Sequence, residues 1–326
     1  MVGEIFLTRR LPAVGAAEVG ARGADFEKTH FDELNTEDFF MLNVPADYEI
    51  VIKPTKGWFK LNLGDVWHYR DLLGLLVHRD FVSKYKQTVL GPLWFIIQPL
   101  LMTVVFTVVF GKIAQIPTDG IPPMLFYLCG LLGWNYFATT FQAASGTLTS
   151  NANLFGKVYF PRLVVPLSTV ISGFIAFAIQ LVTFLAFWSY FKFFTAFGDS
   201  LHLGWDLLWF PLVMLQIALL SLGVGLWLTS LTAKYRDFTF LTGFLVQIWM
   251  YATPVIYPLS RIPEDWRWVA VLNPMTMPVE AIKRIFLGQG VVEPTYVAVS
   301  VVMTLVLLLT GIVVFNKVEK TFVDTV

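Results

Sequence analysis

The stretch YVAVSVVMTLVLLLTGIVVF, residues 296–315, decides the fold class because it contains twenty consecutive residues without a charged side chain. A helix needs about 20 apolar residues to cross the hydrocarbon core of a bilayer. A strand of a membrane barrel would instead alternate apolar and polar residues. The stretch therefore predicts a membrane-spanning helix.

The composition of the whole chain is that of a membrane protein. Of its 326 residues, 56% are hydrophobic and 14% are charged, whereas a soluble domain has about 25% charged residues. The net charge is zero, which argues against a broadly basic nucleic-acid binder. The single cysteine, Cys129, excludes an internal disulfide framework, and the four histidines lack metal-ligand spacing, so no metal site is expected.

Charge-free runs recur along the chain and predict an all-α integral membrane protein with six transmembrane helices. Residues 1–60 hold 17 of the 46 charges and are expected to form a soluble cytoplasmic N-terminal extension. Residues 61–88 are expected to form an amphipathic interface helix, and residues 89–326 the six-helix membrane domain. The spans are predicted near 90–110, 124–144, 163–187, 207–231, 238–257 and 296–315.

Basic residues in the short loops predict the orientation of these spans. Lys157 and Arg162 lie between spans two and three, and Lys234 and Arg236 lie between spans four and five. Cytoplasmic loops carry an excess of lysine and arginine. Both termini are therefore expected in the cytoplasm.

Residues 64–85 are amphipathic without forming a span. Val66, Tyr69, Leu73 and Leu76 share one face of a helix over this segment. Such a helix is expected to lie along the cytoplasmic membrane surface. It would either anchor the N-terminus or dock a partner.

The segment 258–293, between spans five and six, is expected to form a helical hairpin on the outer, periplasmic side. Glu280 and Lys283 are predicted on one face of its second helix, opposite an apolar face, and Gly288 suits the C-terminal end of that helix. The hairpin would either gate an exit or cover the helix bundle. The residues assigned to this outer gate are Trp266, Trp268, Met275, Ile282 and Phe286.

The polar content of the predicted spans restricts the mechanism. They contain no acidic or basic residue, whereas ion-coupled transporters usually need an intramembrane charge. The chain also lacks a G-x-x-x-x-G-K-[ST] phosphate-binding loop, so ATP-driven transport would require a separate subunit. The amides of span glutamines would suit a hydroxyl-rich substrate or would join helices. These glutamines are Gln98, Gln142, Gln180, Gln216 and Gln247.

Aromatic side chains cluster in the second and fifth spans. Their ring faces could stack on sugars inside a channel, and an interfacial belt of tryptophan and tyrosine explains the clusters equally well. The channel candidates are Trp134, Tyr136, Phe137, Phe141, Trp249, Tyr251 and Tyr257.

Six short segments then follow one another along the chain. They are RDFVSKYKQTVLGPLWFIIQPLL (79–101), NANLFGKVYFPRLVVPL (151–167), LTAKYRDF (231–238), ATPVIYP (252–258), LNPM (272–275) and EKTFVDTV (319–326). In this order they resemble the ABC-2 type permeases that export polysaccharides and polyol phosphates. The likeness covers roughly residues 50–326 and leaves out the first 45 or so.

The resemblance implies a transport subunit and not an enzyme. It implies a homodimer in the bacterial cytoplasmic (inner) membrane, bound to two copies of an ABC ATPase subunit that hold ATP and Mg; no cofactor is expected on this chain. The substrate would be an undecaprenyl-diphosphate-linked glycan, with O-antigen preferred over capsule-like polymer or teichoic acid. Such a chain would serve polysaccharide transport and lipopolysaccharide biosynthesis, with membrane lipid and no nucleic acid among its partners.

The resemblance also assigns coupling to the ATPase to a short rigid helix between spans two and three, for which a plain cytoplasmic turn is the alternative. The coupling residues would be Ser150, Asn151, Asn153, Leu154, Phe155 and Lys157.

Basic residues just before spans one and five are candidates to receive the lipid pyrophosphate, because in the family these spans border a lateral opening and arginine and lysine bind phosphate. The alternative is that they only set the topology. They are Arg79, Lys84, Lys86, Lys234 and Arg236.

Two other functions compete with glycan export. The first is an ABC-2 permease for a drug or hydrophobic small molecule. The second is a membrane-embedded lipid-glycan transferase or ligase, which would need acidic or histidine catalysts at the outer surface. Glu264, Asp265, Glu280 and Glu293 are the candidates, and they show no paired arrangement.

Overall fold

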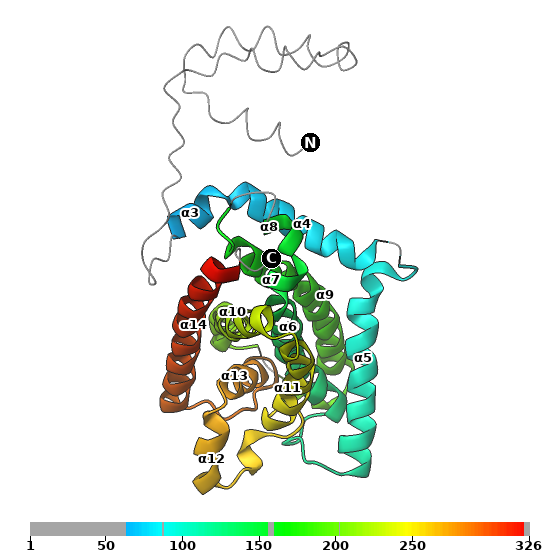
Figure 1. Cartoon of the computed structure of the whole chain (residues 1–326). Coiled ribbons are helices and arrows are strands. Elements are labelled where there is room, and N and C mark those ends of the chain that lie inside the picture. Colours follow the sequence, from blue (N-terminus) through cyan, green and yellow to red (C-terminus); the bar gives the residue numbers. More distant parts are fainter. Residues whose placement is uncertain (1–62, 87, 156–159, 202, 323–326) are drawn as a thin grey trace, which may run out of the picture. The chain divides into compact units, whose positions relative to one another are not determined.

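The computed structural model describes residues 63–86, 88–155, 160–201 and 203–322 (Figure 1). Over these residues it contains helices and no strand, which confirms the all-α class. The predicted extension 1–60 and the candidate Lys157 lie outside the described residues.

The helical elements follow one another from the N-terminal to the C-terminal side of the described chain. They are α3 (Leu63–His68), α4 (Arg70–Tyr85), η2 (Gly91–Leu93), α5 (Trp94–Phe106), η3 (Thr107–Ile113), α6 (Pro123–Ser145), α7 (Thr147–Ser150), α8 (Ala152–Phe155), α9 (Val164–Phe194), η4 (Ala196–Ser200), η5 (Trp205–Trp209), α10 (Phe210–Lys234), α11 (Phe238–Ala252), η6 (Leu259–Arg261), α12 (Glu264–Val271), α13 (Thr276–Leu287) and α14 (Pro294–Phe322). Most elements of η type are 3-10 turns, and η3 is a π-helical continuation of α5.

Four stretches of the described chain are long and apolar enough to cross a membrane. They are Gly91–Ile113, Val164–Phe194, Trp205–Lys234 and Pro294–Glu319.

The other two predicted spans correspond to α6 and α11. Helix α11 has only 15 residues and ends at Ala252 rather than at 257. Helix α6 is 23 residues long, but polar side chains such as Asn135 and Gln142 lower its hydropathy. Length and hydropathy thus support four spans, and the count of six stays a prediction.

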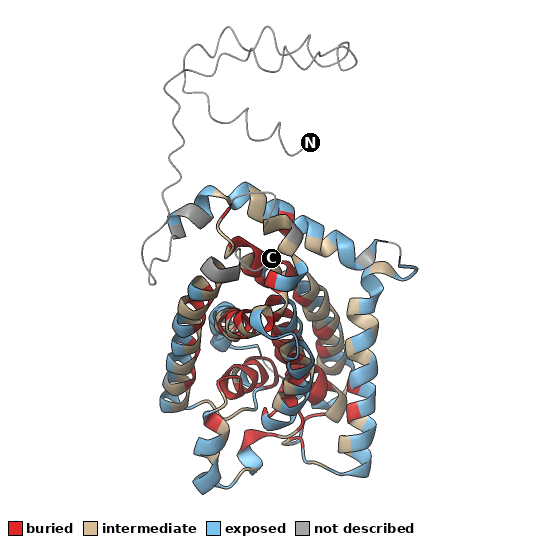
Figure 2. Ribbon diagram, viewed as in Figure 1, coloured by how far each residue is buried: buried red, intermediate tan, exposed pale blue. Residues whose placement is uncertain are grey.

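Helix α6 lies at the centre of the helical domain. Helices α5, α9, α10, α11 and α13 all pack against it, and 17 of its 23 residues are buried. Figure 2 shows buried residues concentrated in α6, α10 and α13, while α5 and α14 are largely exposed. A helix surrounded by other helices can bear polar side chains, because its neighbours rather than lipid meet them.

Helices α10 and α14 approach each other closely through two glycines. A Cβ atom at Gly223 would lie 2.8 Å from the backbone of Leu308, and one at Gly311 would lie 2.5 Å from the carbonyl oxygen of Gly223. Small residues at such crossings let the helix backbones pack tightly in a membrane.

The predicted surface helix 64–85 is divided at Tyr69 into α3 and α4. Helix α4 packs on the start of α9, where Leu76 is buried against Phe160, Val164 and Val165. This apolar contact explains how α4 is held, and its place at a cytoplasmic surface stays a prediction.

Replacing Gly311 with alanine is expected to lower the melting temperature of the purified chain in detergent, because the new Cβ would collide with backbone and force α10 and α14 apart. Gly243 in α11 is the matched control, since nothing lies within 4 Å of a Cβ there. A glycine inside a helix is about 1 kcal/mol less favourable than an alanine, so Gly243→Ala should preserve or raise the melting temperature. Equal melting temperatures for the two variants would contradict this packing.

Candidate functional site

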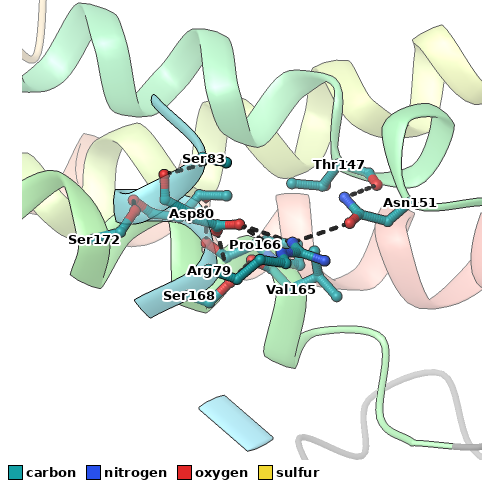
Figure 3. Close-up of polar contacts among 10 residues, drawn as sticks. Arg79, Asp80, Ser83, Thr147, Asn151, Val165, Pro166, Ser168 and Ser172 are labelled. Atoms are coloured by element: carbon teal, nitrogen blue, oxygen red, sulfur yellow. Dashed lines mark hydrogen bonds and ion pairs between the residues drawn. The ribbon is translucent and has the colours of Figure 1, made fainter. Parts of the chain in front are cut away.

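Four side chains join α4, the turn between α7 and α8, and α9 into what we call the α4–α9 junction: Arg79, Asp80, Asn151 and Ser168. The Arg79 guanidinium donates hydrogen bonds to Asp80 Oδ1 (2.8 and 3.1 Å) and to Asn151 Oδ1 (3.2 Å). Ser168 Oγ donates to Asp80 Oδ2 at 3.3 Å. Figure 3 shows Arg79 between Asp80 and Asn151.

The junction connects segments that are distant in the sequence. The side chains of Arg79 and Asp80 are 41% and 16% exposed, so their ion pair is partly shielded from solvent. Charge-assisted hydrogen bonds of this kind are about twice as strong as neutral ones. The junction therefore links the α7–α8 turn to α4 and α9 through side-chain hydrogen bonds.

The predicted coupling segment is not one helix. Its described residues, 150–155, run from the last residue of α7 through Asn151 into α8. Asn151 Nδ2 donates to the carbonyl oxygen of Thr147 at 3.0 Å. A side chain that binds the backbone in this way competes with helix continuation. Ser150 is exposed, Leu154 and Phe155 are half-buried against the α4–α9 contact, and the side chain of Asn153 lies outside the described residues.

The five predicted pyrophosphate-binding cations fall into two groups. Arg79 is engaged by Asp80 and Asn151, so we assign it to the junction, and its part in phosphate binding stays a prediction. The other four are exposed and form no salt bridge with any described residue. They are Lys84, Lys86, Lys234 and Arg236.

A groove of about 540 Å³ lies between α5, α6 and α9. Lys84, near the end of α4, is the charged residue in its lining. The uncharged polar residues of the lining are Gln98, Asn135, Thr139, Thr140, Thr169 and Gln180. Two of the five span glutamines, Gln98 and Gln180, therefore lie on the surface of one groove.

The aromatic cluster of α6 belongs to the core. Trp134, Tyr136, Phe137 and Phe141 are at most 2% exposed, and the Phe137 ring lies 5.7 Å from that of Phe141. Their burial contradicts the predicted channel position, because the surrounding helices of the same chain cover them.

The aromatic residues predicted around span five differ in exposure. Trp249 is half-buried and donates through Nε1 to Asn273 Oδ1 at 2.7 Å. Tyr251 is exposed and Tyr257 half-buried. Of the seven channel candidates, these three keep some accessible surface.

The predicted outer gate is divided between an exposed and a buried part. Trp266 and Trp268 of α12 are exposed. Met275, Ile282 and Phe286, at the start of α13 and within it, are buried and contribute to the main core. Gly288 ends α13 with φ 70°, which confirms the expected stop.

Helix α13 also contains a buried ion pair that contradicts its predicted polar face. Lys283 Nζ donates to Glu280 Oε1 at 3.2 Å, to Tyr257 O at 3.4 Å and to Pro254 O. Glu280 Oε2 accepts a hydrogen bond from Val291 N at 3.0 Å. Both charged side chains are 1% exposed, because this face packs against α6 and the 254–257 segment.

The environment of Lys283 is strongly apolar apart from these partners. Its Nζ lies 4.1 Å from the centre of the Phe126 ring on α6. Burial lowers the pKa of Lys283, and the carboxylate of Glu280 opposes that shift. The i,i+3 spacing of Glu280 and Lys283 was the available sequence signal, but it cannot distinguish a buried pair from an exposed one.

The comparison with protein families covers all of these features. The sequence model described as ABC-2 type transporter matches residues 71–287. The chain belongs to the ABC-2 type transporter family. The matched residues run from α4 through α13 and so include the α4–α9 junction, the groove and the buried ion pair.

Individual relatives are export proteins. An O-antigen export system permease, RfbA of Klebsiella pneumoniae, is 26% identical over 266 residues, which cover 81% of this chain and 97% of the relative. RfbA of Myxococcus xanthus is 26% identical over 265 residues, covering 80% and 98%. The capsule polysaccharide export inner-membrane protein CtrC of Neisseria meningitidis serogroup B is 23% identical over 264 residues, covering 77% and 92%.

These ABC-2 relatives are transport proteins and not enzymes, and they export polysaccharides. Within the described part of this ABC-2 chain, no three histidine, cysteine, aspartate or glutamate residues are grouped so that they could hold a metal ion.

Glu280→Ala is expected to reduce the free energy of unfolding by about 3–5 kcal/mol, because it leaves Lys283 buried without its counter-charge. The effect should appear as a lower melting temperature in detergent. Glu264→Ala is the control, since the Glu264 side chain is 85% exposed and its surface ion pair is worth at most about 1 kcal/mol. The double variant Glu280→Leu/Lys283→Met should recover the melting temperature of the unaltered chain. Equally small decreases in melting temperature for Glu280→Ala and Glu264→Ala would contradict the buried ion pair.

Proposed function

We propose that this chain is the membrane permease of an ATP-driven exporter that moves an undecaprenyl-diphosphate-linked polysaccharide, specifically O-antigen, across the bacterial cytoplasmic membrane. The observation that carries this proposal is the similarity to an O-antigen export permease over 97% of that relative's length. A match of this extent includes the elements that surround the groove and the junction, and not only an isolated span.

The working assembly in this proposal contains two copies of the chain and two ATPase subunits that hold ATP and Mg. The chain has no phosphate-cradling loop of its own. In this proposal α6 and α11 are the second and fifth membrane spans, so the chain crosses the membrane six times. Both termini then lie on the cytoplasmic side. The central position of α6 supports this count, because a helix enclosed by others needs less hydropathy than one in lipid.

Coupling in this assembly runs through α7 and α8. Closure of the ATPase subunits would press on these short helices, and the α4–α9 junction would convert the movement into a tilt of α9. Helix α6 would follow because it continues through Gly146 into α7. Packed helices respond to such a load by rigid-body movement. Asn151 is the residue on α7–α8 that receives Arg79.

The groove combines polar and apolar lining residues. Eight of its fifteen lining residues are apolar or glycine, and the other seven are polar or charged. Here amide and hydroxyl side chains come from all three helices that form the groove. These groups match the hydroxyls of a sugar.

Hydrolysis of ATP is the direct test of this function. The chain is purified in nanodiscs with and without its co-expressed ATPase partner, and each sample receives an undecaprenyl-diphosphate oligosaccharide or a hydrophobic drug. We expect hydrolysis only in the complex and a change in its rate with the lipid-linked glycan. A rate that responds to the drug and not to the glycan would establish the competing function.

The same assay tests the coupling route through matched variants. Asn151→Ala removes a hydrogen bond to a charged group, worth about 1.5–3 kcal/mol, and should greatly reduce the glycan response while ATP hydrolysis persists. Thr149→Ala is the control, because Thr149 lies exposed on α7 and bonds only to the carbonyl oxygen of Gly146. Equal glycan responses in both variants would exclude Asn151 from coupling.

A further inference from the structure

The groove between α5, α6 and α9 contains hydrogen-bonding groups that the chain leaves unused. Among the described residues, the exposed Gln98 amide lines the groove and has no hydrogen-bond partner. A polar group without a partner is costly away from water, so this amide requires an explanation if α5 spans the membrane.

The other amides of the groove are only weakly engaged. Asn135 Nδ2 donates to Gln180 Oε1 at 3.5 Å, which is the long limit for a hydrogen bond. The second N–H of Asn135 and the amide group of Gln180 remain available to a ligand. Three amides on one hollow surface therefore offer both donors and acceptors.

A glycine lets α9 approach α6 closely at the wall of the groove. Gly173 of α9 lines the groove, and a Cβ atom there would lie 2.7 Å from Thr140 Oγ1. Any larger side chain at this position would collide with α6 and displace the groove wall.

The single cation of the groove is also unengaged. Lys84 is exposed and forms no ion pair with a described residue. Asp80, one turn earlier on α4, is the nearest acidic residue in the sequence, and its carboxylate is held by Arg79 and Ser168. The groove therefore presents a net positive charge beside neutral amides.

We propose that this groove binds the head of the lipid-linked glycan, with the phosphate on Lys84 and the hydroxyls of the adjoining sugar on Gln98, Asn135 and Gln180. The inference rests on the proposed export function and adds a residue-level site to it. A free cation selects an anionic ligand, and unpaired amides select one that is rich in hydroxyls. A sugar attached to a lipid phosphate has both properties and reaches the groove from the bilayer.

Binding to the complex of this chain with its ATPase partner tests the inference, in nanodiscs made of phosphatidylcholine. The apparent Kd is measured for an undecaprenyl-diphosphate oligosaccharide and for sugar-free undecaprenyl diphosphate. Gln98→Leu should raise the Kd of the oligosaccharide lipid by about fivefold, the effect of one lost hydrogen bond, and should leave the sugar-free lipid unaffected. Lys84→Met should raise both values.

Matched controls come from the same chain. Gln142→Leu changes an exposed glutamine of α6 that does not line the groove, and Lys112→Met changes an exposed lysine of η3. Both should bind like the original chain. Gln98→Ala serves as a second variant if the leucine prevents assembly of the complex.

The outcomes separate this inference from the proposed function. If the unaltered complex binds the oligosaccharide lipid and neither Gln98→Leu nor Lys84→Met changes its Kd, the groove assignment is wrong and export stands. If the unaltered complex does not bind that lipid, the proposed function itself fails. If phosphatidylglycerol competes as strongly as the oligosaccharide lipid, the groove is a site for bilayer lipid. If a second copy of the chain can be cross-linked across the groove, the groove is an interface between copies.

Discussion

The packing of α6 against five neighbouring helices is the constraint on which the rest of the structure depends. Its buried residues meet α9, α10 and α13, so any shift of α6 would disturb its packing against all three. Its C-terminal end leads through Gly146 into α7, and its exposed side contributes Asn135 and Thr139 to the groove. One helix therefore connects the α4–α9 junction, the groove and α13.

The charges of the helical domain follow from the same constraint. A buried charge is tolerated where a counter-charge and hydrogen-bond acceptors surround it. Lys283 meets this condition through Glu280 and two backbone carbonyls, and its contact with Phe126 ties α13 to α6. The Arg79–Asp80 pair obeys the same rule at the α4–α9 junction, where it is less deeply buried. Each ion pair lies within one helix, and its members reach neighbouring segments through further contacts: Lys283 with Pro254 O and Tyr257 O, Arg79 with Asn151, and Asp80 with Ser168.

The sequence predicts the helices well and their surroundings poorly. Long apolar runs located the stretch that became α14, and the expected stop at Gly288 is observed. Hydropathy does not separate lipid-facing residues from core residues, so it predicts a channel or an interfacial belt for the aromatic cluster around Phe137 and misses its burial. For the same reason Glu280 and Lys283 were placed on an open face: amphipathic spacing reports which residues share a side of a helix, but not what packs against that side. The side chains of the groove come from separate helices, so only the three-dimensional arrangement could assemble them.

Movement of the substrate itself is the most direct measure of the central claim, that the chain exports a lipid-linked glycan. Proteoliposomes containing the chain and its ATPase partner would carry an undecaprenyl-diphosphate oligosaccharide, and a membrane-impermeant glycosidase would report which leaflet holds the sugar. The account predicts that ATP changes the fraction of sugar open to digestion and that omitting either the chain or ATP abolishes this change. An unchanged fraction in a complex that hydrolyses ATP would contradict the claim.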